Sequence, residues 1–329
     1  MSALLASGVN DRFVVLILAS AVLYGTPLLF AALGELLAER SGVLNLGVEG
    51  MMLLGAVMGF WAVQSLEAAG GVTLGGAVLV AALAGALMAL IHAFLVITLR
   101  ANQIVSGLAL TIFAGAAGLS SYLGNDLDLS GVPAAVTFVP LDVLGLGDLP
   151  VVGPIIFDQS ALVYLSWACT LAIGLYLART RPGLNVRAVG ESPAAADAMG
   201  INVTAYRYAH TLAGGALAGI GGACFSLQIT PQWVTGLTGG AGWIAVALVI
   251  FAFWRADLCL VGAYLFGAFS ALPLLLQARG WLTGVPSEVF TSLPYVMTIV
   301  VLVAVSSGAA KRRLGAPAAL GIPYVREER

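Results

Sequence analysis

The sequence carries very little charge. Only 9% of its 329 residues are Asp, Glu, Lys or Arg, against about 25% in a typical soluble domain. The hydrophobic fraction is 60% and the mean hydropathy is +1.01. Since a water-soluble fold of this size could not bury so much apolar surface, we expect an integral membrane protein that contacts the lipid bilayer. The net charge of −2 leaves no basic face to follow phosphates, so we expect no nucleic acid among its partners.

Several kinds of reactive group are also missing. The three cysteines lie in apolar stretches without a CxxC pair, which indicates small buried side chains rather than a metal or redox site. The only lysine, Lys311, follows Ala310, so the Gly-Lys pair of a standard nucleotide-binding P-loop is absent. There is no HExxH zinc motif and no serine flanked as in a nucleophile elbow. The chain is therefore expected to be no enzyme and to hold no metal or cofactor of its own.

Long apolar runs make up most of the remaining sequence. A membrane-spanning helix needs about 20 mostly apolar residues. Nine runs meet or approach this length, namely 13–34, 43–66, 72–99, 102–123, 161–178, 208–230, 241–254, 257–277 and 289–307. The run 241–254 is short, and it either continues into the next run or forms half of a broken span. Because the runs are continuously apolar rather than alternating, they predict an all-α, polytopic transmembrane helical bundle of nine to ten spans, with residues 1–329 as one domain.

The arginines predict the orientation. Loop 124–160 contains five aspartates and no Lys or Arg, loop 179–207 contains four arginines, and the tail 308–329 begins with a Lys-Arg-Arg run. Because positively charged loops stay in the cytoplasm, loop 179–207 and the C-terminus are expected inside, and loop 124–160 outside. Nine spans would place the N-terminus outside and ten would place it inside, and the charges do not decide between them.

Polar residues and glycines interrupt the second run. Asn45 and Glu49 are four residues apart and share one helical face, while three glycines break the helical pattern around them. Irregular backbone at membrane depth is tolerated only where it faces protein or a cavity. One interpretation is a broken helix near 41–50 that lines a pathway. The other is a helix that starts near the inner surface, with both polar side chains among the lipid headgroups.

A second polar group opens the fourth run. Asn102, Gln103 and Ser106 lie in its first turns, and Asn102 and Ser106 share a face. Such side chains either hold neighbouring helices together by hydrogen bonds or contact a polar solute. With Asn45 and Glu49 they form the set that we predict to line a substrate pathway.

The long inner loop is predicted to contain a helix of its own. Ser192 can cap a helix that starts at Pro193, the following alanines favour it, and Gly200 can end it. A short Ala-rich helix along the inner face presents a small, smooth ridge that suits a groove on a soluble partner. Docking of a partner is the favoured interpretation because the chain lacks an energy source. The alternative is an ordinary structured loop.

Small residues recur every four positions in 208–222. Gly215 and Gly219 have this spacing, as do Gly214, Ala218 and Gly222. In membranes such spacing lets helix backbones approach closely, so this segment is predicted to be a tight helix-packing face.

Four segments carry a resemblance to a known family. They are GELLAERSGVLNLGVEGMMLLGA (34–56), NQIVSGLALT (102–111), GLNVRAVGESPAAADAMGI (183–201) and GWIAVALVIFAFWR (242–255). Together they resemble permease subunits of bacterial ABC importers in the branched-chain amino acid/ribose group. The resemblance is closer to the permeases for nucleosides and simple sugars. It follows the family's order and extends over most of the chain.

The resemblance implies a function and a set of partners. The chain would be a transmembrane permease subunit of an ATP-driven importer for a small polar solute, a nucleoside or a simple sugar, in the bacterial cytoplasmic (inner) membrane. A cytoplasmic ABC ATPase, commonly with two fused nucleotide-binding domains, would hold the ATP and Mg²⁺. A second, homologous permease would complete the pore, and an extracytoplasmic substrate-binding lipoprotein would deliver the solute.

The resemblance also assigns residues to contact with the ATPase. In the family, the loop that matches 183–201 contains a cytoplasmic coupling helix. The corresponding positions here are Arg187, Gly190, Glu191, Ala194, Ala195 and Gly200.

Three other functions are weighed against this one. A stand-alone secondary transporter would use an ion gradient, but the spans contain few charges of the kind that such carriers bury. A structural membrane scaffold would not need the polar interruptions in the spans. A branched-chain amino acid permease subunit is the alternative within the same family.

Overall fold

The apolar runs form long helices, because a helix pairs every backbone polar group within itself. The computed structural model describes residues 2–66, 70–280, 286, 289, 292–306 and 315–326. Seven helical segments of this part of the chain are long and apolar enough to cross a membrane. They are Phe13–Arg40, Val48–Ser65, Gly71–Thr98, Gln103–Asp126, Ala161–Arg179, Val203–Ile229 and Ala256–Ala278.

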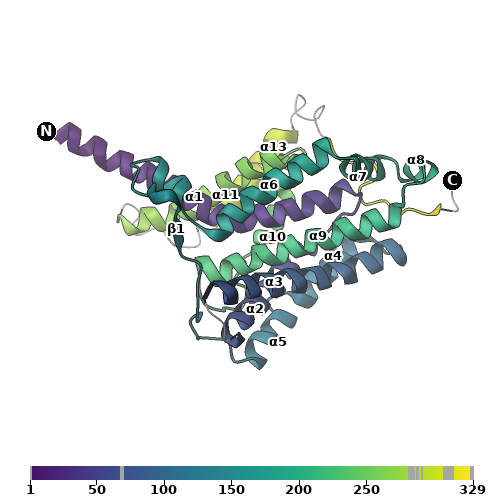
Figure 1. The fold of residues 1–329 in the computed structure, drawn as a ribbon, viewed down its shortest axis with the longest axis horizontal. Helices are drawn as coiled ribbons and strands as arrows, with labels where there is room; N and C mark the ends of the chain where they lie inside the picture. The colour runs from purple at the N-terminus through teal and green to yellow at the C-terminus, as the bar shows by residue number, and fades with distance from the viewer. Residues whose placement is uncertain are drawn as a thin grey trace.

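The described α-helices appear in Figure 1 with their labels. They are α1 (Ser2–Arg40), α2 (Val48–Ser65), α3 (Gly70–Ala93), α4 (Gln103–Ala114), α5 (Leu119–Asp126), α6 (Ala161–Arg179), α7 (Arg181–Glu191), α8 (Pro193–Ala198), α9 (Val203–Cys224), α10 (Ala241–Phe251), α11 (Ala256–Ala278) and α13 (Leu293–Ser306). Short π-helical stretches extend α3 and α9, over Phe94–Thr98 and Phe225–Ile229. Between α5 and α6, the strands β1 (Pro140–Asp142) and β2 (Asp158–Ser160) pair antiparallel.

Two of the nine predicted spans differ from the other seven. The run 241–254 is α10, a helix of only 11 residues. It does not continue into α11, because Phe253 and Trp254 adopt positive φ angles of 50° and 54° and turn the chain. The run 289–307 is described as a helix over Leu293–Ser306, and several residues before it lie outside the described part. The Lys-Arg-Arg run of the tail also lies outside it.

Helix α9 lies at the centre of the bundle and packs against α1, α2 and α3 (Figure 1). Its glycines allow this close approach. A Cβ atom on Gly214 would lie 2.6 Å from the carbonyl oxygen of Gly34 in α1, and one on Gly215 would lie 2.6 Å from that of Gly85 in α3. The predicted small-residue packing face is therefore confirmed.

The two ends of the described chain lie at opposite ends of the bundle. The N-terminal part of α1 extends beyond one end, near β1, whereas α7, α8 and the described C-terminal tail gather at the other (Figure 1). This arrangement needs an odd number of crossings, a condition that the seven membrane-length segments of the described residues meet. The total of nine or ten spans stays a prediction.

Candidate functional site

Residues 41–47, between α1 and α2, are not helical although they lie inside the bundle. Side chains from neighbouring helices pair their backbone groups. Glu35 in α1 accepts a hydrogen bond from the Asn45 backbone N–H (N to Oε1, 2.9 Å), and Gln103 in α4 accepts one from the Leu44 N–H (N to Oε1, 2.7 Å). Such pairing is what allows non-helical backbone inside a membrane bundle. A non-helical segment therefore precedes α2, as both interpretations of the sequence allow, and it lies beside α7 and the tail; that it lines a pathway stays a prediction.

Two more side chains bind residues 41–47, the non-helical segment that we call the break. His92 in α3 bridges the Leu44 carbonyl oxygen (Nε2 to O, 3.1 Å) and the Ser106 hydroxyl (Nδ1 to Oγ, 3.0 Å). The Thr111 hydroxyl donates to the Leu46 carbonyl oxygen (2.9 Å). Helices α1, α3 and α4 therefore all hold the break. His92 was not among the predicted pathway residues, and its only signal in the sequence is a polar side chain within an apolar run.

Glu49 joins the start of α2 to the start of α10. Its Oε1 accepts hydrogen bonds from the Thr238 hydroxyl (2.6 Å) and the Gly240 N–H (2.9 Å), and its Oε2 accepts one from the Gly242 N–H (2.7 Å). A helix N-terminus has unpaired N–H groups and a positive dipole end, both of which favour a carboxylate. Glu49 is only 7% exposed, so it acts as a buried cap from one helix to another.

The structure thus brings three of the five predicted pathway residues together and places the other two elsewhere. Asn45, Gln103 and Ser106 are buried together around the break. Glu49 lies at α10, and Asn102 is exposed at the start of α4, which it caps by accepting a backbone hydrogen bond. The amide nitrogen of Gln103 is buried and has no hydrogen-bond partner among the described residues. It is a donor that a polar solute could use.

Loop 179–207 folds into the adjacent helices α7 and α8. The predicted start of α8 is confirmed, since Ser192 caps it by accepting a hydrogen bond from the Ala195 N–H (3.4 Å) and Pro193 is its first residue. Gly200, just beyond its end, has a φ of +81°, a conformation that strongly favours glycine. Met199 beside it is 82% exposed.

Five of the six residues assigned to ATPase contact lie on the surface of this helix pair, namely Arg187, Glu191, Ala194, Ala195 and Gly200. Gly190 is different. It is buried, and a Cβ atom there would clash with the backbone carbonyl of Arg40 at the end of α1. Gly190 therefore packs the helix pair against α1 and does not itself offer a surface.

The described tail, residues 315–326, connects the helix pair to the break. The Ala319 N–H donates to the Gly190 carbonyl oxygen (2.9 Å), and the Gly321 N–H donates to the Gly42 carbonyl oxygen (3.3 Å). The tail therefore contacts both α7 and residues 41–47. The sequence predicted only a cytoplasmic tail here, because its contacts depend on residues far away in the chain.

Comparison with known proteins identifies the family to which this geometry belongs. The family model described as "Branched-chain amino acid transport system / permease component" matches residues 17–305. The chain belongs to this family of permeases. The predicted resemblance is confirmed, and with its seven membrane-length helices the permease is a multi-pass membrane protein.

Three relatives illustrate the similarity. The permease is 41% identical over 321 residues to a putative glucose ABC transporter permease protein of Haloferax volcanii, with 92% of this chain and 95% of the relative covered. It is 35% identical to a nucleoside ABC transporter permease protein of Lactococcus lactis, with 95% and 98% covered. It is 34% identical to a guanosine ABC transporter permease protein of Bacillus subtilis, again with 95% and 98% covered. No solved structure gives a significant match.

Proposed function

We propose that the permease carries a nucleoside or a simple sugar into the cell, as one membrane subunit of an ATP-driven importer. The similarity to permeases named for glucose, nucleosides and guanosine supports this solute class. One polar group at the break also supports it, because the buried amide nitrogen of Gln103 has no hydrogen-bond partner among the described residues. Such a donor suits a neutral polar solute.

The importer needs partners that supply energy and solute. A cytoplasmic ABC ATPase with two fused nucleotide-binding domains binds ATP and Mg²⁺. A second, homologous permease completes the pore. An extracytoplasmic lipoprotein delivers the solute to the side of loop 124–160. In this assembly the permease lies in the cytoplasmic membrane with α7, α8 and the C-terminus inside, and it holds no cofactor of its own.

The observation that carries the mechanism is the continuous contact between α7, the tail and the break. Closure of the nucleotide-binding domains moves α7 and α8, whose exposed residues form the docking surface. Gly190 passes the movement to α1 by direct packing, and the tail passes it to Gly42. The bundle then alternates between outward-open and inward-open states by rigid-body movement.

Co-purification tests the proposed assembly. The permease is tagged at its C-terminus, extracted from native membranes in mild detergent, and its stoichiometric partners are identified by mass spectrometry. We expect an ATPase with two nucleotide-binding domains and a second permease. Recovery of this chain alone, folded and active in uptake driven by an ion gradient, would contradict the importer and favour a secondary transporter.

Ala195→Arg tests the docking surface. The side chain is exposed on α8, so the substitution should leave the fold intact but place a bulky charge where the ATPase docks. We expect ATP-driven uptake to fall by about fivefold or more, the range of a typical coupling free energy, while ATP hydrolysis continues. Ala195→Ser keeps the surface small and is the matched control. Equal uptake by both variants would exclude α8 from the docking surface.

A further inference from the structure

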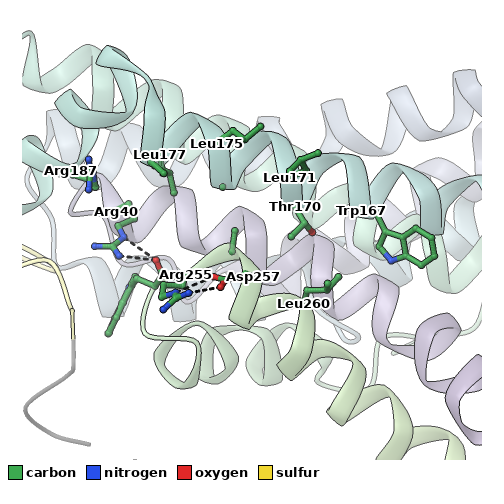
Figure 2. A pocket seen from close by; sticks show the side chains of 14 residues that line it. Arg40, Trp167, Thr170, Leu171, Leu175, Leu177, Arg187, Arg255, Asp257 and Leu260 are labelled. Atoms are coloured by element: carbon green, nitrogen blue, oxygen red, sulfur yellow. Dashed lines mark hydrogen bonds and ion pairs between the residues drawn. The ribbon is translucent and has the colours of Figure 1, made fainter. Parts of the chain in front are cut away.

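A cavity of about 590 Å³ lies between α6 and α11 and reaches Arg40, the last residue of α1. This volume falls in the usual range for small-molecule sites, about 300–1,000 Å³. Figure 2 shows Arg40, Arg187 and Arg255 at one end of the cavity, while leucines and Trp167 line the rest. Arg187 also belongs to the proposed docking surface, but neither that surface nor the proposed solute pathway explains the apolar cavity beside it.

The apolar part of the cavity has the length of one membrane leaflet. Its wall on α6 extends from Trp167 to Ala178, which at 1.5 Å per residue is about 16 Å. Half of a typical hydrocarbon core is about 15 Å. Leu171 and Leu175 line the cavity and are also 64% and 50% exposed, so the cavity opens sideways toward the lipid. Its shape and surface suit an acyl chain.

The charged end lies beside α7 and is positive. Three arginines and one aspartate line the cavity. Arg255 and Asp257 neutralise each other, with two hydrogen bonds of 2.5 and 3.1 Å. The Arg40 guanidinium is held at the rim by donating to the neutral carbonyl oxygens of Trp254 (2.8 and 3.2 Å) and Gly315 (3.3 Å). The acidic side chains that interact with it, Glu39 and Glu191, do not line the cavity.

Arg187 supplies a second positive charge. It is exposed at the cavity rim and forms no hydrogen bond or ion pair within the described ranges of the chain. Arginine binds phosphate oxygens through paired N–H groups, and basic pockets between membrane helices bind anionic lipid headgroups.

We propose that this cavity is a binding site for an anionic phospholipid of the leaflet on the α7 side. One acyl chain lies along α6 and α11, and the phosphate binds between Arg40 and Arg187. Because Arg187 belongs to α7, the bound lipid connects the membrane to the helix pair that we propose as the docking surface.

Lipid retention by the assembled importer tests the site. The complex is reconstituted in phosphatidylcholine nanodiscs that contain a small fraction of phosphatidylglycerol, re-extracted, and the retained lipid is quantified by native mass spectrometry. Gly174→Leu fills the cavity without a backbone clash, since a Cβ atom there meets only the Ala256 Cβ at 3.8 Å. Arg187→Gln removes the unpaired charge and leaves the cavity open.

Two matched substitutions serve as controls. Gly75→Leu adds the same side chain at an open position on α3, where a Cβ atom meets nothing within 4 Å. Arg181→Gln removes a charge from an exposed residue of α7 that does not line the cavity. Gel filtration and thermal unfolding of all four variants check that each is folded.

We expect the wild-type protein and both controls to retain phosphatidylglycerol, and Gly174→Leu and Arg187→Gln each to lose it by about fivefold or more. Undiminished retention by either test variant would overturn the site. Equal retention of phosphatidylcholine would also overturn it. Full displacement of the lipid by soluble glycerophosphate would do so too, because it would indicate a phosphate site that does not bind an acyl chain. A partner helix filling the cavity in the complex would also abolish retention by the wild-type protein and contradict the proposal.

Discussion

At the scale of single residues, the permease uses acidic and polar side chains to hold helix ends inside an apolar bundle. Glu49 caps α10 across 193 residues of sequence, and Glu35, Gln103 and His92 bind the backbone of the break. Each of these side chains pairs a backbone group that lipid could not satisfy. Polar residues in the spans are therefore structural supports as well as candidates for solute contact.

Glu49→Ala is predicted to destabilise the permease by about 3 kcal/mol. The substitution removes the acceptor for three donors, the Thr238 hydroxyl and the Gly240 and Gly242 N–H groups, and each buried donor left unpaired costs about 1–3 kcal/mol. Unfolding of the detergent-solubilised protein measures the change. Glu191→Ala is the control, because Glu191 is exposed and, among the described residues, accepts a single hydrogen bond, from the Ala318 backbone N–H (3.3 Å). Equal stability of the two variants would mean that Glu49 does not anchor α10.

At the scale of elements, the length of a helix follows from its apolar run and the turns that bound it, whereas its contacts depend on which distant helices pack against it. Helix α10 has 11 residues, or about 16 Å, half of a hydrocarbon core of about 30 Å. It begins at the Glu49 cap and ends at the turn formed by Phe253 and Trp254. The short apolar run in the sequence predicted its length, but not that its start would meet the start of α2.

Gly214→Ala is predicted to weaken the contact between α9 and α1. The added Cβ would lie 2.6 Å from the Gly34 carbonyl oxygen, and overpacking of this kind costs about 1–3 kcal/mol. Alanine gains back about 1 kcal/mol of helix propensity, so the net effect should be a loss of stability, measured by thermal unfolding. Gly75→Ala, at an open position on α3, should be neutral or stabilising. A stabilising effect at both positions would show that the helices can separate at no cost.

At the scale of the whole molecule, the bundle has two chemically different ends. One end holds β1, β2 and the N-terminal part of α1, and the other holds α7, α8 and the described tail (Figure 1). A solute delivered at one end and an ATPase bound at the other would act on opposite faces of the membrane.

Cysteine labelling tests this orientation. The three native cysteines are replaced, and single cysteines are introduced at Val139 and Leu184, which are 61% and 58% exposed at opposite ends. In intact cells, a membrane-impermeant maleimide should label Val139→Cys but not Leu184→Cys. Permeabilised cells, in which both sites should react, provide the control for accessibility. The reverse pattern would invert the proposed orientation.

Features that depend on composition and local spacing were predictable from the sequence. Apolar run length predicted the membrane helices, Ser192 and Pro193 predicted the start of α8, and the glycines of 208–222 predicted a packing face. The physical reason is that these features depend on residues close together in the sequence: a membrane span on about 20 consecutive residues, and capping and small-residue packing on one or two helical turns.

Other features were decided only by which distant segments meet. Gly190 and Glu191 are neighbours in sequence, yet Gly190 is buried under α1 and Glu191 is exposed. Asn102 and Gln103 are also adjacent, but Gln103 reaches the break while Asn102 caps its own helix. A side chain's direction follows from its helix, but the partner that it meets depends on how the helices pack. That packing, and not the local sequence, determined the hydrogen bonds of the break, the Glu49 cap and the contacts of the tail.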